Sequence, residues 1–320
     1  MIWTVKKILL LWYTINENFG DVLIYNTIKD YLEKNNCICD YIDVGRPCIE
    51  IVQKANDYDF LLFAGGGIIE RYVPNVIRYF KEDYEVLKVP YGIIGLSIGK
   101  FNYSEYSETI RFWIEKSEFF YTRDEYSAMI LNKIGGSDKV KNGVDIVWAN
   151  ESIWKKTHKQ SNEVGINVRD VPYVDIYPDI DWREIKKIVN ENNISIQIPD
   201  ESGQEIAGLA KYDYNINEVI KQISRCGIIV AMRYHVILVA AILGVPSIPI
   251  AYCNKVHELS LQLKLNEYEV DVAHVSNVND YIKRMQNEYD SVKKKIADNS
   301  LLMRENAQVI LKNVVEIING

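Results

Sequence analysis

The sequence predicts an α/β protein made of two doubly wound domains. Short apolar runs, typical of buried parallel strands, alternate with segments of helical periodicity along most of the chain. The 320 residues also exceed the length of about 250–300 residues at which a single hydrophobic core usually stops growing. Residues 150–162 are polar and aperiodic, which indicates a linker. We therefore expect one domain over residues 1–155 and a second over residues 156–320.

The expected first domain alternates strands with helices. Continuous apolar runs predict strands over residues 8–13, 38–44, 59–64, 89–96, 119–122 and 144–148. Apolar residues at helical spacing predict helices over residues 22–34, 105–116 and 125–134. Asp21 and Asp124 each precede one of these helices and can accept hydrogen bonds from its first N–H groups. Such an alternation favours a parallel sheet.

The expected second domain repeats the pattern. Apolar runs predict strands over residues 163–168, 194–198 and 247–252, with another that begins at residue 228. Helical spacing predicts helices over residues 182–190, 215–225, 236–243 and 256–263. Residues 277–318 are expected to be mostly helical, with one charged face. The strand, turn, helix and strand of residues 228–252 form the most apolar stretch and organise this domain.

Composition excludes several classes of function. The net charge is −7, and duplex binding needs a basic face, so nucleic acid is not expected as a partner. The five cysteines are odd in number and form no C-x-x-C pair, so we expect reduced thiols and no disulfide framework. The four histidines lack the spacing of metal ligands, so we expect no metal site.

The sequence predicts a cytoplasmic protein. Residues 5–13 resemble the apolar core of a signal peptide, but polar residues follow them and no small-residue cleavage site does. No apolar stretch approaches the roughly 20 residues of a membrane span. Association with the inner face of the membrane would then be peripheral, through a lipid-linked substrate or a partner enzyme.

Glycines and cations follow the carboxyl ends of several expected strands. They are Gly65, Gly66, Gly67, Gly99, Arg123, Arg169, Arg233, His235 and Lys255. Ligands of open parallel sheets bind at this edge, and in two domains facing each other such edges would line one cleft. Several cations there predict an anion site, although any one of them alone would as readily form a structural ion pair.

The glycine triplet and the Arg-x-His turn each allow two interpretations. Gly65, Gly66 and Gly67 suit close approach of the backbone to an anion, or simply a tight turn under a packed helix. The G-x-G-x-x-G spacing of dinucleotide-binding loops is absent. Arg233 and His235 suit an anionic substrate and proton transfer, or structural hydrogen bonds to loop carbonyls.

Several short segments, in their order along the chain, resemble the motifs of one family. They are Asn18-Phe19-Gly20-Asp21, the strand and loop from Asp59 to Gly67, Gly95-Leu96-Ser97-Ile98-Gly99, Arg123-Asp124-Glu125-Tyr126-Ser127, Met232-Arg233-Tyr234-His235, and Gly244-Val245-Pro246 with Tyr252 and Lys255. On these residues the chain resembles the polysaccharide pyruvyl transferases over roughly residues 14–260. Tyr234 departs from the pattern, since the family commonly has an aliphatic residue there.

The resemblance implies a GT-B-like fold, in which two Rossmann-like domains face each other across a cleft. It also implies transfer of the carboxyvinyl unit of phosphoenolpyruvate onto two hydroxyls of a sugar, which forms a pyruvate ketal and releases phosphate. The acceptor sugar would be lipid-linked or nucleotide-linked and belong to cell-surface polysaccharide biosynthesis. Beyond phosphoenolpyruvate as donor substrate, no cofactor is expected.

The resemblance also implies roles for individual residues. Arg233 and His235 would contact phosphoenolpyruvate, with Arg169 beside them. The other substrate-binding candidates are Lys255, Arg123, Asn18, Gly65, Gly66 and Gly67. We expect His235 to act as the general acid that protonates the methylene carbon, and Asp21 to accept a proton from the sugar hydroxyl. The first domain would then hold the acceptor and the second the donor.

Two other functions stay open at this point. A glycosyltransferase of the same fold would use a nucleotide sugar, and Asp200 or Glu201 would bind its ribose. A non-catalytic subunit of a polysaccharide assembly complex would bind the anion without turnover. Release of phosphate from phosphoenolpyruvate, or of nucleotide from a sugar donor, separates these alternatives.

Overall fold

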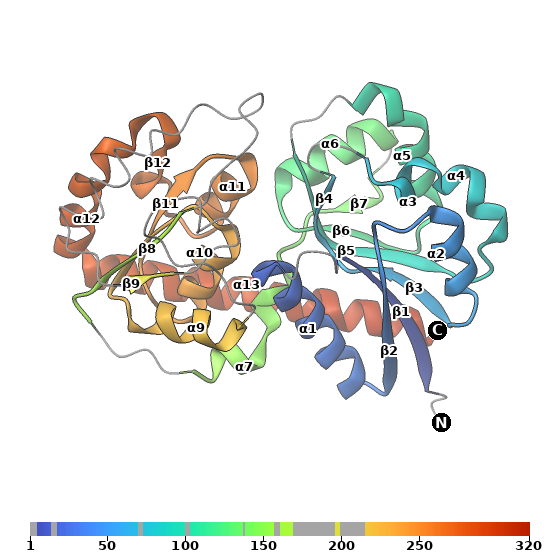
Figure 1. Cartoon of the computed structure of the whole chain (residues 1–320), viewed down its shortest axis with the longest axis horizontal. Coiled ribbons are helices and arrows are strands. Elements are labelled where there is room, and N and C mark those ends of the chain that lie inside the picture. The colour runs from blue at the N-terminus through green and yellow to red at the C-terminus, as the bar shows by residue number, and fades with distance from the viewer. Residues whose placement is uncertain are drawn as a thin grey trace. The chain divides into compact units, whose positions relative to one another are not determined.

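The computed structural model describes residues 5–13, 18–69, 73–99, 103–136, 138–156, 161–168, 196–198 and 215–320. The chain forms two compact units (Figure 1). Unit 1 comprises Met1–Ala149 and Arg304–Gly320, and unit 2 comprises Asn150–Met303. The boundary thus precedes the expected one by a few residues. The last part of the chain, which the sequence assigned to the second domain, belongs to unit 1.

Unit 1 is built on a parallel sheet with the strand order β2-β1-β3-β5-β6-β7, and β4 also pairs with β5. Every pairing between its described strands is parallel. The strands are β1 (Lys6–Trp12), β2 (Cys37–Asp43), β3 (Phe60–Phe63), β4 (Gly66–Ile69), β5 (Tyr91–Ile98), β6 (Phe120–Thr122) and β7 (Val140–Lys141). The first five expected strands are confirmed within a few residues.

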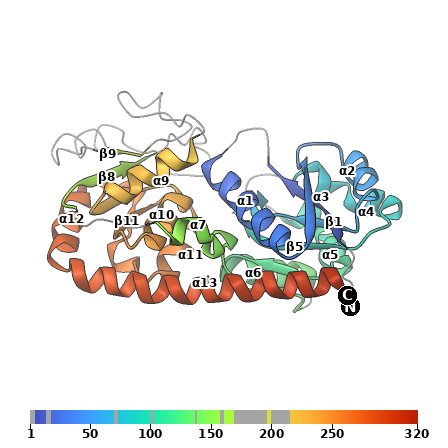
Figure 2. The ribbon, with the colours of Figure 1, turned by 90° about the horizontal axis from the view of Figure 1, so that it is seen from below.

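Helices cover both faces of this sheet (Figures 1 and 2). They are α1 (Phe19–Lys34), α2 (Cys48–Ala55), α3 (Asn75–Arg78), α4 (Phe80–Asp83), α5 (Ser107–Lys116) and α6 (Glu125–Gly135), with α13 (Tyr289–Asn319) arriving from unit 2. Leu9 and Leu61 pack with α2 to α6 in one apolar cluster. Successive side chains of a strand point to opposite faces of the sheet. Leu10 and Leu62, which follow Leu9 and Leu61, therefore point to the opposite face.

The strand expected over residues 144–148 is wrong. Ile146–Ala149 form a 3₁₀ helix, η3, and Val140–Lys141 take the edge position as β7. The cause is Asp145, whose Oδ1 accepts a hydrogen bond from Val147 N at 2.9 Å and so turns the chain. The sequence also gave no sign of β4, which begins inside the glycine triplet and pairs with the end of β5.

Unit 2 has a second parallel sheet with the order β12-β11-β10-β8-β9. Its strands are β8 (Val164–Asn167), β9 (Ile196–Gln197), β10 (Ile228–Ala231), β11 (Ser247–Ala251) and β12 (Val270–Asp271). Its helices are α7 (Glu151–Trp154), α9 (Ile216–Arg225), α10 (Tyr234–Ile242), α11 (Asn254–Gln262), α12 (Val278–Asn287) and the first part of α13. The helix expected over residues 182–190 lies outside the described residues.

The stretch that organises unit 2 forms the elements that the sequence predicts. β10 and β11 are neighbours in the sheet, and α10 connects them. All but one of the nine residues of α10 are buried, the exception being His235. A helix that is apolar on all sides belongs in the interior, so α10 is a rigid support for the turn that precedes it.

Candidate functional site

The carboxyl edge of the unit 2 sheet brings together the beginnings of two helices. Arg233 follows β10 as the N-cap of α10, and Cys253 follows β11 as the N-cap of α11. Because β10 and β11 are adjacent and parallel, both helices start at the same edge, and α10 packs against α11. The positive ends of two helix dipoles therefore lie at one edge, which favours an anion.

Three of the predicted residues lie at this edge. Arg233 caps α10, His235 is in its first turn, and Lys255 is the second residue of α11. All three side chains are half-buried, so each is held by the protein and still reaches solvent. The His235 ring meets the Tyr234 ring edge-on, with 5.0 Å between centroids. The helix expected over residues 256–263 begins two residues earlier, at Asn254, so Lys255 lies inside α11.

The sequence missed one residue of this edge. Asn167, the last residue of β8, is fully buried. Its Oδ1 accepts a hydrogen bond from Arg233 N at 3.2 Å, and its Nδ2 donates to Ile198 O at 3.2 Å. A buried amide inside an otherwise apolar strand was the available signal, since such a group must find partners. Arg169, singled out instead, lies outside the described residues, as do Asp200 and Glu201.

The predicted residues of unit 1 form a corner between α1 and β4. Asn18 caps α1, and its Oδ1 accepts hydrogen bonds from Gly20 N at 2.9 Å and from Asp21 N at 3.4 Å. Gly66 has φ of +88°, and a Cβ placed on it would lie 3.3 Å from Asp21 Oδ1. The structure thus brings the Asp21 carboxylate against the glycine turn, and Asn18 fixes the first turn of the helix.

The glycine turn is shaped by close packing against β5. Gly65 has φ of +79°, and a Cβ there would lie 2.6 Å from Ile94 O. A side chain is therefore excluded both by conformation and by the neighbouring backbone. Gly67 continues into β4 and is half-buried. The structure fits the interpretation of Gly65 as part of a tight, closely packed turn. Gly66 belongs to the same turn and lies next to the Asp21 carboxylate.

The expectation that Arg123 contacts the substrate needs correction. Its side chain is 2% exposed, and Nη1 lies 3.1 Å from Oδ2 of Asp145, which is 1% exposed. Nη2 donates a hydrogen bond to Ser97 Oγ at 2.6 Å. The guanidinium therefore neutralises a buried carboxylate and joins the ends of β5 and β6 to η3. We assign Arg123 a structural role in unit 1.

Asp124 has the capping role that the sequence predicts. Its Oδ1 accepts a hydrogen bond from Ser127 N at 2.7 Å at the start of α6. Burial raises the pKa of this carboxyl above its ordinary value of 3.8, while the hydrogen bonds from Ser127 and the charge of Arg123 oppose that shift. The group is thus part of the same buried polar cluster.

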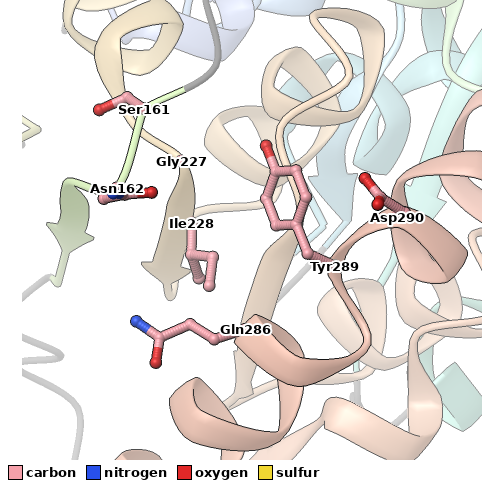
Figure 3. A pocket seen from close by; sticks show the side chains of 7 residues that line it. All are labelled: Ser161, Asn162, Gly227, Ile228, Gln286, Tyr289 and Asp290. Atoms are coloured by element: carbon pink, nitrogen blue, oxygen red, sulfur yellow. The ribbon is translucent and has the colours of Figure 1, made fainter.

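A pocket of about 550 Å³ opens at the other edge of the unit 2 sheet (Figure 3). Its described lining residues are Ser161, Asn162, Gly227, Ile228, Gln286, Tyr289 and Asp290. Ile228 begins β10, so the length of that strand separates the pocket from Arg233. Among these lining residues the only charge is the carboxylate of Asp290, which disfavours an anionic ligand.

Other classes of site are not found in the described part of the chain. It contains no group of three or more His, Cys, Asp or Glu side chains able to hold a metal ion. All five cysteines are free thiols, and Cys253 is the least buried of them. None of the helices in the described ranges combines the length and apolarity needed to cross a membrane.

Solved structures with a similar fold include a UDP-GlcNAc 2-epimerase and an alpha-glucosyltransferase. The UDP-GlcNAc 2-epimerase from Neisseria meningitidis bound to UDP-GlcNAc has a TM-score of 0.60 at 12% identity, over 97% of this chain and 100% of that chain. The S. aureus MnaA–UDP co-structure has a TM-score of 0.59 at 11% identity, covering 98% and 97%. An alpha-glucosyltransferase in complex with UDP-glucose and DNA containing an abasic site has a TM-score of 0.54 at 11% identity, covering 98% and 99%.

At such low identity these likenesses show the fold, and they identify a GT-B-like α/β protein with two Rossmann-like units. The chain belongs to the polysaccharide pyruvyl transferase family, whose model matches residues 18–254. The match begins at the Asn18 cap and ends in the first turn of α11, one residue before Lys255. Membership supports a transferase and confirms the resemblance found in the motifs. A comparison with curated protein sequences finds no match.

Proposed function

We propose that the protein is a pyruvyl transferase that moves the carboxyvinyl unit of phosphoenolpyruvate onto two hydroxyls of a sugar. The observation that carries the proposal is the carboxyl edge of the unit 2 sheet, where Arg233, His235 and Lys255 surround two helix N-termini. Phosphoenolpyruvate carries a carboxylate and a phosphate. Arginine binds such groups by paired hydrogen bonds, and lysine binds them as a point charge.

In the proposed reaction His235 donates a proton to the methylene carbon of phosphoenolpyruvate. The central carbon becomes cationic in character, and the first sugar hydroxyl forms a C–O bond to it. The proton of that hydroxyl goes to a base, which restores the proton balance. The second hydroxyl then displaces phosphate, which leaves with the bonding electrons and takes up the second hydroxyl proton. The product is a methyl-bearing ketal and inorganic phosphate.

The cationic edge has a direct consequence for the donor. Both anionic groups of phosphoenolpyruvate would be held by fixed positive groups, so the phosphate is stabilised as it leaves.

The first test is a thermal-shift titration of the full chain with phosphoenolpyruvate, inorganic phosphate and UDP-sugars. A ligand at a hundredfold excess over its Kd stabilises the native state by about 2.7 kcal/mol. We expect phosphoenolpyruvate to raise the midpoint in the wild type and to lose this effect in Arg233→Ala. Arg225→Ala is the matched control, because Arg225 is exposed in the last turn of α9, next to the amino end of β10.

Each result of the titration decides between functions. A response to phosphoenolpyruvate that survives in Arg233→Ala would remove the proposed donor site. A response to UDP-sugars alone would favour a nucleotide-sugar glycosyltransferase, a function suggested by the UDP-containing structures of the same fold. Phosphoenolpyruvate binding without phosphate release in an acceptor screen would favour a non-catalytic subunit of a polysaccharide assembly complex, at the membrane or in the cytoplasm.

A further inference from the structure

The turn that carries Arg233 is held by a side chain from a different strand. β8 pairs with β10 in register as far as Asn167 opposite Ala231, where the strands end. The main chain continues the ladder by one more bond, from Met232 N to Asn167 O at 2.9 Å. At the next residue the side chain takes over, since Asn167 Oδ1 accepts a hydrogen bond from Arg233 N at 3.2 Å.

The same amide also fixes the neighbouring strand. Asn167 Nδ2 donates to Ile198 O at 3.2 Å, just after β9. One fully buried side chain thus connects the carboxyl ends of β8, β9 and β10. Only a side chain with an acceptor and a donor on one planar group can do this. Aspartate would keep the acceptor alone, and leucine of similar shape would keep neither.

The position of Arg233 decides what this contact does. Arg233 has φ of −76° and ψ of 124°, so it is extended, while the next residue is already helical. As the N-cap it sets the direction in which α10 leaves the sheet, and with it the place of His235 two residues on. The hydrogen bond from the backbone N–H of Arg233 to Asn167 therefore constrains both Arg233 and His235. Asn167 itself is buried and does not reach the site.

We propose that Asn167 is a positioning residue of the donor site, which orients Arg233 and His235 for an anion with a carboxylate and a phosphate. The inference rests on the proposed function for the identity of that anion. Its structural part, the constraint on the Arg233 backbone, stands on the geometry alone. Asn167 is a positioning residue and not a catalytic one, because these hydrogen bonds connect its side chain to the backbone at Arg233 and Ile198.

The test compares Asn167→Leu with a matched control in unit 1. Asn132 also uses both amide atoms on the backbone, with Nδ2 donating to Val140 O at 2.8 Å and Oδ1 accepting from Val140 N at 3.0 Å. Asn132→Leu therefore removes similar bonds away from the site. Calorimetric titration with phosphoenolpyruvate, run where all variants are folded, measures Kd. We expect Asn167→Leu to weaken binding about tenfold or more, and Asn132→Leu to leave Kd unchanged.

A second variant and a second readout keep the test decisive. Asn167→Asp retains the acceptor for Arg233 N–H but brings a carboxylate near the bound anion. Because the bond to Arg233 N–H is kept, hydrogen exchange at the Arg233 amide in Asn167→Asp should stay as slow as in the wild type. Without any ligand, hydrogen exchange at the Arg233 amide should be faster in Asn167→Leu than in Asn132→Leu.

The outcomes separate the inference from the proposed function. Wild-type affinity for phosphoenolpyruvate in Asn167→Leu, or unchanged exchange at Arg233, would overturn the positioning role. If Asn167→Leu does not fold, exchange at the Arg233 amide that is faster in Asn167→Asp than in the wild type overturns it. If the wild type does not bind phosphoenolpyruvate, the proposed function is overturned, and so is the donor named for this site. This holds even if hydrogen exchange at the Arg233 amide is faster in Asn167→Leu, as expected.

Discussion

Arg123 and Asp145 form an ion pair inside unit 1, with 3.1 Å between Nη1 and Oδ2 and almost no exposure of either side chain. Asp145 comes just before η3, and Arg123 follows β6, so the pair ties a 3₁₀ turn to the end of the strand next to the sheet edge. η3 in turn packs against α1. The first helix of the chain, which carries Asp21, therefore rests on a turn that this ion pair holds.

Breaking the pair should cost far more than replacing it. Arg123→Met leaves the Asp145 carboxylate buried without its partner, and we expect a loss of about 3–5 kcal/mol in the free energy of unfolding. The double variant Arg123→Met/Asp145→Asn should recover part of this loss, because it removes the buried charge and keeps the acceptor for Val147 N. Urea unfolding followed by tryptophan fluorescence measures both, since Trp113 and Trp148 are buried in unit 1. A double variant as unstable as Arg123→Met would contradict the pairing.

The glycine turn can be tested by comparing two glycines of unit 1. Gly136 has φ of +64° and no atom near the position of a Cβ, so Gly136→Ala should cost only the left-handed penalty of about 1–2 kcal/mol. Gly65→Ala adds a clash with Ile94 O, and we expect a loss of about 3 kcal/mol or more. Equal losses in the two unfolding curves would show that the turn at Gly65 relaxes freely.

Asp124 should leave a signature in the pH dependence of stability. Burial raises its pKa in the folded protein above the ordinary value near 3.8. The folded state then binds more protons than the unfolded state, so this group's contribution is present at low pH and is lost as pH rises through the raised pKa. Asn caps a helix as well as Asp does, so Asp124→Asn isolates the effect.

The measurement is the free energy of unfolding from about pH 4 upwards. The wild type should lose stability relative to Asp124→Asn as the pH rises, until the carboxyl is fully ionised. Parallel profiles for the two proteins would mean that burial does not perturb this group.

Thiol reactivity should distinguish Cys253, at the carboxyl edge of the unit 2 sheet, from the other cysteines. Cys253 is half-buried at the N-cap of α11, while the other four cysteines are buried. Burial raises the pKa of Cys39 and of Cys226 to about 12, which keeps them protonated and slow to react. We expect one fast thiol in the native protein with a mild thiol reagent, and none in Cys253→Ser.

The same reagent reports on the donor, because Cys253 lies two residues before Lys255. Phosphoenolpyruvate should slow its modification, while glycerol at equal concentration should not. Several thiols reacting at the same fast rate would contradict the burial seen here.

His235 should matter more for turnover than for binding. Replacing a general acid typically lowers the rate by about 10²–10⁴-fold, whereas Arg233 and Lys255 would still hold the donor. Phosphate release with an active acceptor measures turnover of His235→Gln, and calorimetry measures its affinity for phosphoenolpyruvate. His257→Gln is the control, since His257 is exposed and pairs with Glu269. Turnover like that of the wild type in His235→Gln would remove it from the mechanism.

The strands, and the candidate site residues at their carboxyl ends, could be predicted because both depend on local sequence. Strands buried on both faces read as unbroken apolar runs, and a cation or glycine directly after such a run must lie at the carboxyl edge. This reasoning placed Arg233, His235 and the glycine triplet correctly. It also placed Asp124 at the start of α6, but the cap expected at Asp21 is wrong, because Asn18 caps α1 and Asp21 lies in its first turn.

What local sequence could not show was the partner of each edge residue. Arg123 and Arg233 stand in equivalent places after a strand, yet one is buried on Asp145 and the other reaches solvent. The difference depends on a turn 22 residues further along the chain. Asn167 was missed for the same reason, since its partners Arg233 and Ile198 lie beyond the ends of two other strands.

The division of the chain into two units predicts how a truncated protein should behave. Unit 1 is completed by Arg304–Gly320. Ile310 packs where Gly143 leaves no room for a side chain, and burial together with the nearby Glu316 raises the pKa of Tyr31 in α1. A fragment that ends at Ala149 would expose the apolar surface that the last part of α13 covers, and we expect it to aggregate.

A synthetic peptide of residues 304–320 supplied in trans should restore the fragment's solubility. Residues 304–320 would then act as a separable part of unit 1. Affinity tags, stop codons and domain swaps placed within these residues should be judged by their effect on the stability of unit 1.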